Sequence, residues 1–355
     1  MTASGISKSD VPWAHRLENL TLEDGWKVGK RISLPDDHTG GAQSVGFEVS
    51  RGDAQGFLKA LDLYPASKLP APVRLKATRD LIDAFLIECA LYETCGAKKM
   101  DRVVSALAAG AIDVSDEAIV GTVHYVIFER ANATARELFH LSDAYSFAAK
   151  LRVLHNATTG MRQLHASAIA HQDVKLSNLL TFGDTTKVGD LGSAIRRDQS
   201  HPREAEFLAG DPTYAPFEAH YRHAQQDWNR RRLGCDLYLL GSTIAYLLTG
   251  TLITQATNAR LRDDYRWKRW EGSYEEVLPF LQNAFGGILV EFVEPYIPAG
   301  FEQVTLAVKQ LCEPDPLLRG WVLGRGERQD HEQYGLQRLE SRLNWLALSA
   351  KASLP

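Results

Sequence analysis

Residues 171–194 read HQDVKLSNLLTFGDTTKVGDLGSA. This stretch contains Asp173, Lys175 and Asn178, then two short apolar runs around a Gly-Asp turn, and then Asp190. The turn between strand-like runs predicts a tight hairpin. Because such a hairpin reverses the chain, we expect Asp190 to return toward Asp173 and Asn178 and to share one cleft with them.

This set of side chains meets the chemical needs of phosphoryl transfer. An attacking hydroxyl needs a carboxylate that orients it and accepts its proton. Metal ions that bridge phosphates need oxygen ligands, which a carboxylate and an amide supply. A lysine beside the base can neutralise charge on the phosphoryl group that is being transferred. The stretch therefore favours a phosphotransferase.

The same residues resemble the eukaryotic-type (Hanks-type) serine/threonine protein kinase family. Residues 171–178 look like the catalytic loop of that family, and residues 190–192 (Asp-Leu-Gly) look like its metal-binding triplet. The resemblance implies that Asp173 is the catalytic base, that Lys175 stabilises the transferred charge, and that Asn178 and Asp190 bind the metal. Its implied cofactors are ATP and Mg²⁺.

Three later motifs are similar to further segments of this family. Residues 210–218 (GDPTYAPFE) look like the end of the activation loop, and residues 236–241 (DLYLLG) look like the start of the buried central helix. Residues 315–319 (DPLLR) look like the motif whose arginine pairs with the glutamate that ends the activation loop. The resemblance thus implies a buried pair between Arg319 and Glu218, and it covers about residues 26–325.

Upstream of these motifs, Gly56-Phe57-Leu58-Lys59 stands where the family keeps its nucleotide-binding lysine. Glu88 is its expected partner, with Glu93 on the same predicted helix as the alternative. Lys59 and Glu88 therefore complete the implied catalytic set. The implied nucleotide site consists of Lys59, Gly40, Gly41, Ala42, Gln43, Ser44, Val45, Phe57, Glu129, Ala131 and Leu180.

Several positions depart from the family pattern. Glycines 40, 41 and 46 do not form a regular GxGxxG loop, and Phe57 replaces the small residue that usually lies over the adenine. Gln172 replaces the arginine that reads a phosphate on the activation loop in many relatives, so we expect activity without phosphorylation between Gly192 and Gly210. Asp211 stands where serine/threonine-specific members usually have a threonine, and the nearby Thr213 is the candidate substitute.

Composition bounds these interpretations. The 355 residues are 45% hydrophobic and 24% charged with a net charge of −4, which excludes a wholly disordered chain and gives no general reason to expect nucleic-acid or membrane binding. Four scattered cysteines do not form a disulfide framework, and no signal peptide is apparent at the start. The uncharged run from Leu237 is expected to be a buried helix, and the chain is expected to be cytoplasmic.

Hydrophobic periodicity predicts an α+β, two-lobed kinase-like fold. Strand-like runs are expected at residues 26–34, 44–50, 56–63, 103–110 and 124–130, the first three as an antiparallel meander. A long helix is expected to bury Leu81, Phe85, Leu86, Cys89 and Tyr92. The expected divisions are a loose N-terminal extension (1–24), an N-lobe (25–130), a mainly helical C-lobe (131–325) and a helical extension packed on the C-lobe (326–355).

Two groups of residues outside the motifs have more than one interpretation. The basic clusters Arg230-Arg231-Arg232 and Lys268-Arg269, the latter between Trp267 and Trp270, are typical of a solvated surface. They also fit a docking surface for acidic peptides or nucleic acid. The stripe Leu336, Leu339, Leu343 and Leu346 is expected to pack on its own domain.

The sequence therefore predicts a serine/threonine kinase that acts on protein hydroxyls, with autophosphorylation as a further expectation and no membrane or nucleic-acid partner. Two alternatives remain open. A pseudokinase that binds nucleotide without transfer is favoured by the irregular glycine loop and Phe57. A small-molecule kinase of the aminoglycoside or choline type shares the lobes and the spacing from base to amide, but lacks the Glu218–Arg319 closure.

Overall fold

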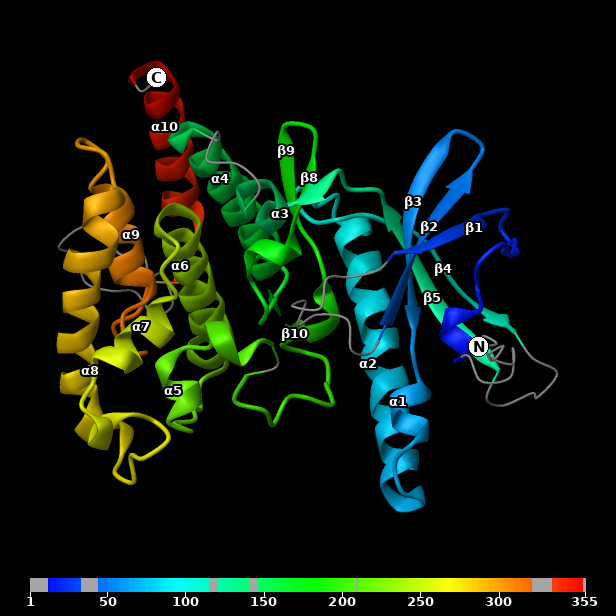
Figure 1. Cartoon of the computed structure of the whole chain (residues 1–355), viewed down its shortest axis with the longest axis horizontal. Helices are drawn as coiled ribbons and strands as arrows, with labels where there is room; N and C mark the ends of the chain where they lie inside the picture. Colours follow the sequence, from blue (N-terminus) through cyan, green and yellow to red (C-terminus); the bar gives the residue numbers. More distant parts are fainter. Residues whose placement is uncertain are drawn as a thin grey trace, which may run out of the picture. The chain divides into compact units, whose positions relative to one another are not determined.

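The structure is a computed structural model that describes residues 12–32, 44–114, 121–140, 146–208, 210–320 and 334–353. The chain divides into two compact units (Figure 1). The small unit comprises Met1–Lys99 and Val104–Ala131, and the large unit comprises Met100–Val103 and Asn132–Pro355. A β-sheet with a long helix forms the small unit and helices dominate the large unit, which confirms the expected α+β fold class.

Among the described residues, the small unit contains one five-stranded antiparallel sheet in the order β1-β2-β3-β5-β4. Its strands are β1 (Lys27–Ile32), β2 (Ser44–Arg51), β3 (Ala54–Leu61), β4 (Ala106–Asp113) and β5 (Thr122–Glu129). Each strand overlaps a run that the sequence predicted, with bounds shifted by up to three residues, and β1 to β3 form the expected meander. The turn from β2 to β3 uses Gly52 at φ +58°, a left-handed conformation that glycine adopts without steric cost.

The segment before the sheet corrects one expectation. Residues 12–24 were expected to be loose, but Ala14, Leu17 and Leu22 are buried in the core of the small unit together with Trp26. A short 3₁₀ helix, η2 (Trp13–His15), begins this segment. The apolar side chains are too irregularly spaced for a helix or strand pattern, yet each fills space against one face of the sheet.

The long helix α2 (Ala71–Ala97) follows the short helix α1 (Tyr64–Ser67). Its buried positions are Phe85, Glu88, Leu91, Tyr92 and Cys95, so the expected face was partly wrong. Leu86 is 53% exposed, because the buried face is rotated to include the charged Glu88. Tyr92 packs against Phe128 of β5 in an edge-to-face arrangement, which attaches the helix to the sheet.

The large unit begins with helices α3 (Ala135–His140) and α4 (Phe147–His165) and short strands that frame the motif region. Strands β6 (Ala133–Thr134), β8 (Leu179–Phe182) and β9 (Thr185–Val188) form one sheet, and β7 (Ile169–Ala170) pairs with β10 (Ile195–Arg196). The β8–β9 hairpin confirms the predicted turn, with Gly183 at φ +58°.

The remaining elements of the large unit are mostly helical. They are η3 (Leu176–Asn178), η4 (Leu191–Ser193), η5 (Pro212–Tyr214), α5 (Phe217–His220), η6 (Asn229–Leu233), α6 (Gly234–Thr249), α7 (Ile253–Arg260), η7 (Asp263–Tyr265), α8 (Tyr274–Ile288), η8 (Leu289–Val293), η9 (Glu294–Tyr296), α9 (Gln303–Leu311) and α10 (Gln337–Ser353). Helix α6 is buried along nearly its whole length, as expected for the uncharged run.

By length and composition, one described helix, Tyr274–Tyr296, is apolar enough to cross a membrane, and the bent pair Asn229–Thr249 with Ile253–Arg260 passes the same test. Core helices of water-soluble proteins also pass this test. One side of α8 is buried against the rest of the large unit, through Val277, Leu281 and Phe285.

The C-terminal helix α10 packs against α4 (Figure 1). Leu336, Leu339, Leu343 and Leu346 are all buried, as the stripe predicted. Glu340 accepts hydrogen bonds from Arg162 Nε at 2.5 Å and from Thr159 Oγ1 at 2.8 Å. Buried apolar side chains and the hydrogen bonds of Glu340 therefore both hold this helix on the large unit.

Candidate active site

The loop that carries Asp173 is held by a carboxylate from the buried helix α6. Asp236 accepts the backbone N–H groups of His171 and Gln172, both at 2.7 Å. His171 contacts the Gly189 carbonyl through Nε2 at 2.9 Å and accepts the Asp173 N–H at Nδ1. Gln172 has φ +64°, a costly conformation for a residue with a Cβ. Asp236 and His171 therefore have structural roles, and they stabilise a strained loop.

Asp173 lies at the centre of a polar cluster in the large unit. The Lys175 ammonium group is 3.1 Å from its Oδ2, and the Asn178 amide donates to the same oxygen at 3.0 Å. The backbone N–H of Asp211 donates to the other oxygen, Oδ1, at 3.0 Å. Both carboxylate oxygens are thus oriented by donors that come from two separate chain segments.

The charge environment of Asp173 sets the pH at which it ionises. Burial raises the pKa of Asp173 above its ordinary value, the Lys175 charge opposes the shift, and the nearby Asp190 carboxylate adds to it. Burial is the largest of these effects, so the pKa stays raised and Asp173 is a stronger proton acceptor than an exposed aspartate. A base with a raised pKa is what proton abstraction from a hydroxyl requires.

Asn178 and Asp190 are brought together by the hairpin. The Gly189 N–H donates to the Asn178 carbonyl at 2.9 Å, which places the next residue, Asp190, beside the loop. Asp190 has φ +58°, a second strained position in the same site. The Asn178 amide nitrogen donates to Asp173, so its Oδ1, with no donor among the described residues, is left for a ligand.

These two residues fit Mg²⁺ by their donor chemistry. Mg²⁺ prefers oxygen ligands and is usually bound by one or two carboxylates plus substrate phosphates, not by a cage made only of protein. The described residues contain no cluster of three or more His, Cys, Asp or Glu side chains suited to a metal. An amide oxygen and one carboxylate supply the protein part of such a site.

In the small unit, Lys59 of β3 pairs with Glu88 of α2. The Lys59 ammonium group donates to both Glu88 oxygens, at 2.8 and 3.0 Å. Glu88 is 4% exposed, and this lysine gives its buried charge an opposite charge. The structure thus pairs Lys59 with Glu88, the expected partner, and not with Glu93.

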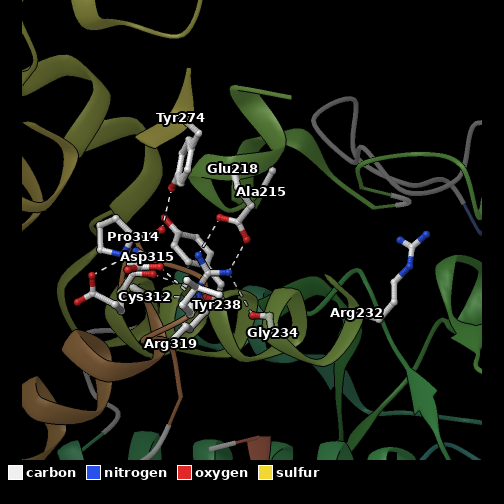
Figure 2. A network of polar contacts seen from close by, with 12 residues as sticks. Ala215, Glu218, Arg232, Gly234, Tyr238, Tyr274, Cys312, Pro314, Asp315 and Arg319 are labelled. Atoms are coloured by element: carbon white, nitrogen blue, oxygen red, sulfur yellow. Dashed lines mark hydrogen bonds and ion pairs between the residues drawn. The ribbon is translucent and has the colours of Figure 1, made fainter. Parts of the chain in front are cut away.

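Arg319 and Glu218 form the expected pair deep in the large unit (Figure 2). The guanidinium donates to both Glu218 oxygens at 2.5 and 2.8 Å, and Arg319 Nε donates to the Glu313 carbonyl at 3.0 Å. The Tyr238 ring lies 5.0 Å from the guanidinium carbon. Burial alone would lower the pKa of Arg319, but the Glu218 carboxylate holds it above its ordinary value.

Comparison with known proteins agrees with this geometry. The family model described as the protein kinase domain matches residues 85–287, which is more than half of the chain. The chain belongs to the protein kinase family. The match includes the Asp173 loop, the Asp190 turn and Glu218, and it begins within α2 of the small unit.

Individual protein kinases are similar over shorter stretches. A Wee1-like protein kinase of Arabidopsis thaliana is 32% identical over 31% of this chain, and serine/threonine-protein kinase ELM1 of Saccharomyces cerevisiae is 31% identical over 28%. Serine/threonine-protein kinase PLK4 of Xenopus laevis is 38% identical over 24%. The matched regions span 20%, 18% and 9% of those relatives, respectively.

The other residues expected in the nucleotide site of this kinase domain are distributed over both units. Gly40, Gly41, Ala42 and Gln43 lie outside the described residues. In the small unit, Ser44 and Val45 begin β2, and Glu129 ends β5 and accepts the Ser105 N–H at 2.7 Å. Ala131 is the last residue of the small unit, and Leu180 lies on β8 of the large unit.

Phe57 changes the local shape of the kinase domain's sheet. A Cβ atom added to Gly46 of β2 would lie only 2.7 Å from the Phe57 ring, so the ring occupies the space above this glycine. Phe57 and Lys59 alternate with buried Leu58 along β3 and therefore share one face of the sheet. The face that presents Lys59 thus carries a large aromatic ring.

Sequence reasoning missed the role of Asp211 in the kinase domain. Its Oδ2 is 3.3 Å from Lys175 Nζ, and its Oδ1 accepts the Thr213 N–H at 2.9 Å. Asp211 thereby links the activation segment to both Asp173 and Lys175. The family resemblance led us to look for a threonine near this position, so the role of Asp211 was not considered. A carboxylate can pair with Lys175 where a threonine hydroxyl would form a hydrogen bond to it.

Gly210 is a second position that the sequence did not single out. A Cβ there would lie 2.2 Å from the Gln172 carbonyl and 2.9 Å from Asp173 Oδ1. We expect Gly210→Ala to lower kcat about 100-fold, because a displacement of about 1 Å at a catalytic group costs that much. Steady-state kinetics will measure this, with Gly183→Asn, at an open turn with φ +58°, as the control that keeps activity. A kcat for Gly210→Ala within threefold of wild type would contradict the close packing.

Proposed function

We propose that this chain is a serine/threonine protein kinase that transfers the γ-phosphoryl group of ATP to protein hydroxyls. The observation that carries the proposal is the meeting of Asp173, Lys175 and Asn178 with Asp211 and the Asp190 turn in one cluster. The names of two relatives, both serine/threonine-protein kinases, support the acceptor class, as does Lys175.

In this proposal, each side chain has one task. Asp173 orients the acceptor hydroxyl and takes its proton, while Lys175 neutralises charge that develops on the transferred group. Asn178 Oδ1 and an Asp190 carboxylate oxygen would hold Mg²⁺, which supplies charge neutralisation on the phosphates when bound. Lys59, fixed by Glu88, binds the α- and β-phosphates of ATP.

A transfer assay tests the function directly. Purified protein with ATP and Mg²⁺ is expected to phosphorylate itself or a generic protein substrate on serine or threonine, and mass spectrometry identifies both the transfer and the residue type. Phosphotyrosine as the main product would overturn the acceptor class. Phosphate on a small alcohol but on no protein would favour the small-molecule kinase, against which the Glu218–Arg319 pair stands.

A nucleotide-binding pseudokinase is the second candidate, and the Phe57 ring above Gly46 is the observation that favours it. A bulky ring on the face that carries Lys59 is expected to reshape how a nucleotide binds. Mg²⁺-dependent consumption of ATP separates the candidates, because a pseudokinase binds nucleotide without turning it over.

Two arginines contact the activation segment through its backbone carbonyls. Gln172 Oε1 accepts from Arg232 at 3.0 Å, and Arg232 donates onward to the Glu204 carbonyl at 2.6 Å. Arg231 donates to the carbonyls of Glu204 and Glu206, at 2.7 and 2.9 Å. Two arginines thus bind the segment through its backbone, where a phosphoresidue and an arginine would otherwise pair.

We therefore expect phosphatase-treated protein to retain at least a third of its kcat. The reason is that Arg232 already has a side-chain amide oxygen and a backbone carbonyl as acceptors in the Gln172–Arg232–Glu204 connection. Kinetics before and after treatment, with complete dephosphorylation confirmed by mass spectrometry, will measure this. Arg232→Gln should lower kcat equally in both preparations, whereas a collapse of wild-type turnover on dephosphorylation would contradict the prediction.

A further inference from the structure

A pocket of about 590 Å³ opens in the large unit beside the activation segment. Its walls include Pro212 and Thr213 on one side and the loop between α7 and α8 on the other. Asp211, whose N–H contacts Asp173, directly precedes Pro212. The pocket therefore begins next to the residue that touches the proposed base.

The loop wall of the pocket is preformed. Arg266 donates to the carbonyls of Leu261 at 3.2 Å and Ala259 at 2.9 Å. The Trp267 ring stacks on His220 with a centroid distance of 4.1 Å and an interplanar angle of 14°. These contacts hold the loop in one shape, so a ligand would not have to order it at its own entropic cost.

The pocket carries an excess of positive charge. Arg266, Lys268 and Arg269 line it against one carboxylate, Asp263, which pairs with Arg266 at 2.8 Å and with Arg269 at 3.1 Å. Lys268 is exposed and has no ion pair among the described residues. Two positive charges therefore remain unbalanced at the mouth of the pocket.

The neutral lining adds polar groups without further charge. Burial lowers the pKa of His220, and its hydrogen bond to the Pro212 carbonyl only partly offsets this, so the imidazole is neutral at pH 7. Its Nε2 is buried with no hydrogen-bond partner among the described residues, as is Asn258 Oδ1.

We propose that this pocket binds an acidic side chain, carboxylate or phosphate, of the peptide that the kinase phosphorylates. The inference rests on the proposed function, because it assigns the pocket to the substrate of the same site. The proposal also gives a specific ligand to the basic cluster Lys268-Arg269, which the sequence alone left open as a solvated surface or a docking surface.

The distance between the pocket and Asp173 limits where the acidic residue stands in the substrate. Thr213 is two residues beyond Asp211, so it lies within about 7.6 Å of it, because consecutive Cα atoms are about 3.8 Å apart. An extended peptide advances about 3.3 Å per residue. The near wall of the pocket at Thr213 therefore lies no more than about two extended residues from Asp211, so the acidic side chain is expected close to the acceptor hydroxyl in the substrate sequence.

Peptide binding to the full chain tests the proposal independently of transfer. Fluorescein-labelled peptides that share one serine and differ at a single nearby position (glutamate, phosphoserine, glutamine or lysine) are titrated by anisotropy. We expect the glutamate or phosphoserine peptide to bind five- to tenfold more tightly than the glutamine peptide, with the advantage lost at high salt. The better of the two acidic peptides identifies carboxylate or phosphate as the preferred group.

Reversing the charge of one pocket residue tests whether the preference for the acidic peptide arises in the pocket. Lys268→Glu is expected to remove the advantage of the acidic peptide and to leave the glutamine peptide unchanged. Arg230→Glu, an equally exposed basic position on η6 outside the pocket, is the matched control and should keep wild-type preference.

Three results would overturn the inference. These are equal binding of all peptides, the same loss in Arg230→Glu, and binding of a single-stranded oligonucleotide that Lys268→Glu abolishes while peptide preference stays unchanged. Failure of the proposed function is distinguishable, because no phosphate would then reach any protein although the acidic peptide still bound.

Discussion

Asp173→Asn is expected to lower kcat by about 10²–10⁴-fold, the range that a positioned general base contributes. An amide keeps the shape of the side chain and can still accept the Asp211 N–H, but it cannot take a proton from the acceptor hydroxyl. Steady-state phosphate transfer measures the loss, and titration with an ATP analogue should show unchanged nucleotide binding. Asp184→Asn, at an exposed turn between β8 and β9, is the control expected to retain wild-type activity.

The pKa of Asp173 separates this loss from misfolding. Burial, the largest influence, raises the folded-state pKa above the unfolded value. The contribution of Asp173 to stability is therefore complete below the unfolded pKa, about 3.9, and is lost as the pH rises through the folded pKa. The ionisation of Asp173 therefore lowers the free energy of unfolding at pH 7, so the Tm of the wild type should rise relative to that of Asp173→Asn as the pH falls toward 4.

Activity should follow the same ionisation. The acid limb of the kcat/KM profile is expected above the pH at which an exposed aspartate titrates, because Asp173 must be deprotonated to act as a base. Lys175→Met removes the charge that lowers this pKa and should move the limb to higher pH. A kcat for Asp173→Asn within threefold of wild type would refute the assignment.

The sequence predicted what depends on local order. The β8–β9 hairpin follows from two apolar runs around Gly183-Asp184, and it alone returns Asp190 toward Asn178. The Lys59–Glu88 pair followed from a motif and a helical face. The sequence pattern of α6, an uncharged run after Asp236, was equally sufficient to predict a buried helix.

Prediction was wrong or silent where the outcome depends on contacts between distant segments. The buried face of α2 was misplaced because counting apolar residues cannot include Glu88, a buried carboxylate that pairs with Lys59. Ala14, Leu17 and Leu22 have no periodicity, so only the three-dimensional core shows that they are packed. The roles of Asp211 and Gly210 could not be predicted because they depend on where the Asp173 loop lies, and that loop comes almost 40 residues earlier in the chain.

The buried pair of Glu218 and Arg319 should give the largest effect on stability. Glu218→Gln is expected to lower the free energy of unfolding by about 3–5 kcal/mol, because it leaves a guanidinium that is fully buried without its counter-charge. Urea unfolding, followed by tryptophan fluorescence, measures the loss. The transition of the large unit is analysed separately, since a chain of two units need not unfold in one step.

The surface pair of Arg260 and Glu291 is a matched control for geometry. It is also bidentate, at 2.6 and 2.8 Å, but both side chains are more than one third exposed. Glu291→Gln should therefore change the unfolding free energy very little, because solvent screens and rehydrates the remaining arginine. A similar loss in both variants would show that burial does not decide the effect.

A double variant tests the reason for the effect. Replacing both partners, Glu218→Gln together with Arg319→Met, removes the stranded charge and should cost clearly less than Glu218→Gln alone. The cation–π contact with Tyr238 is lost in the double variant, so some destabilisation should remain. If the double variant is as unstable as the sum of the single variants, the pair does not act as a unit. The stability of the large unit then depends on the packing of each side chain and not on their charges.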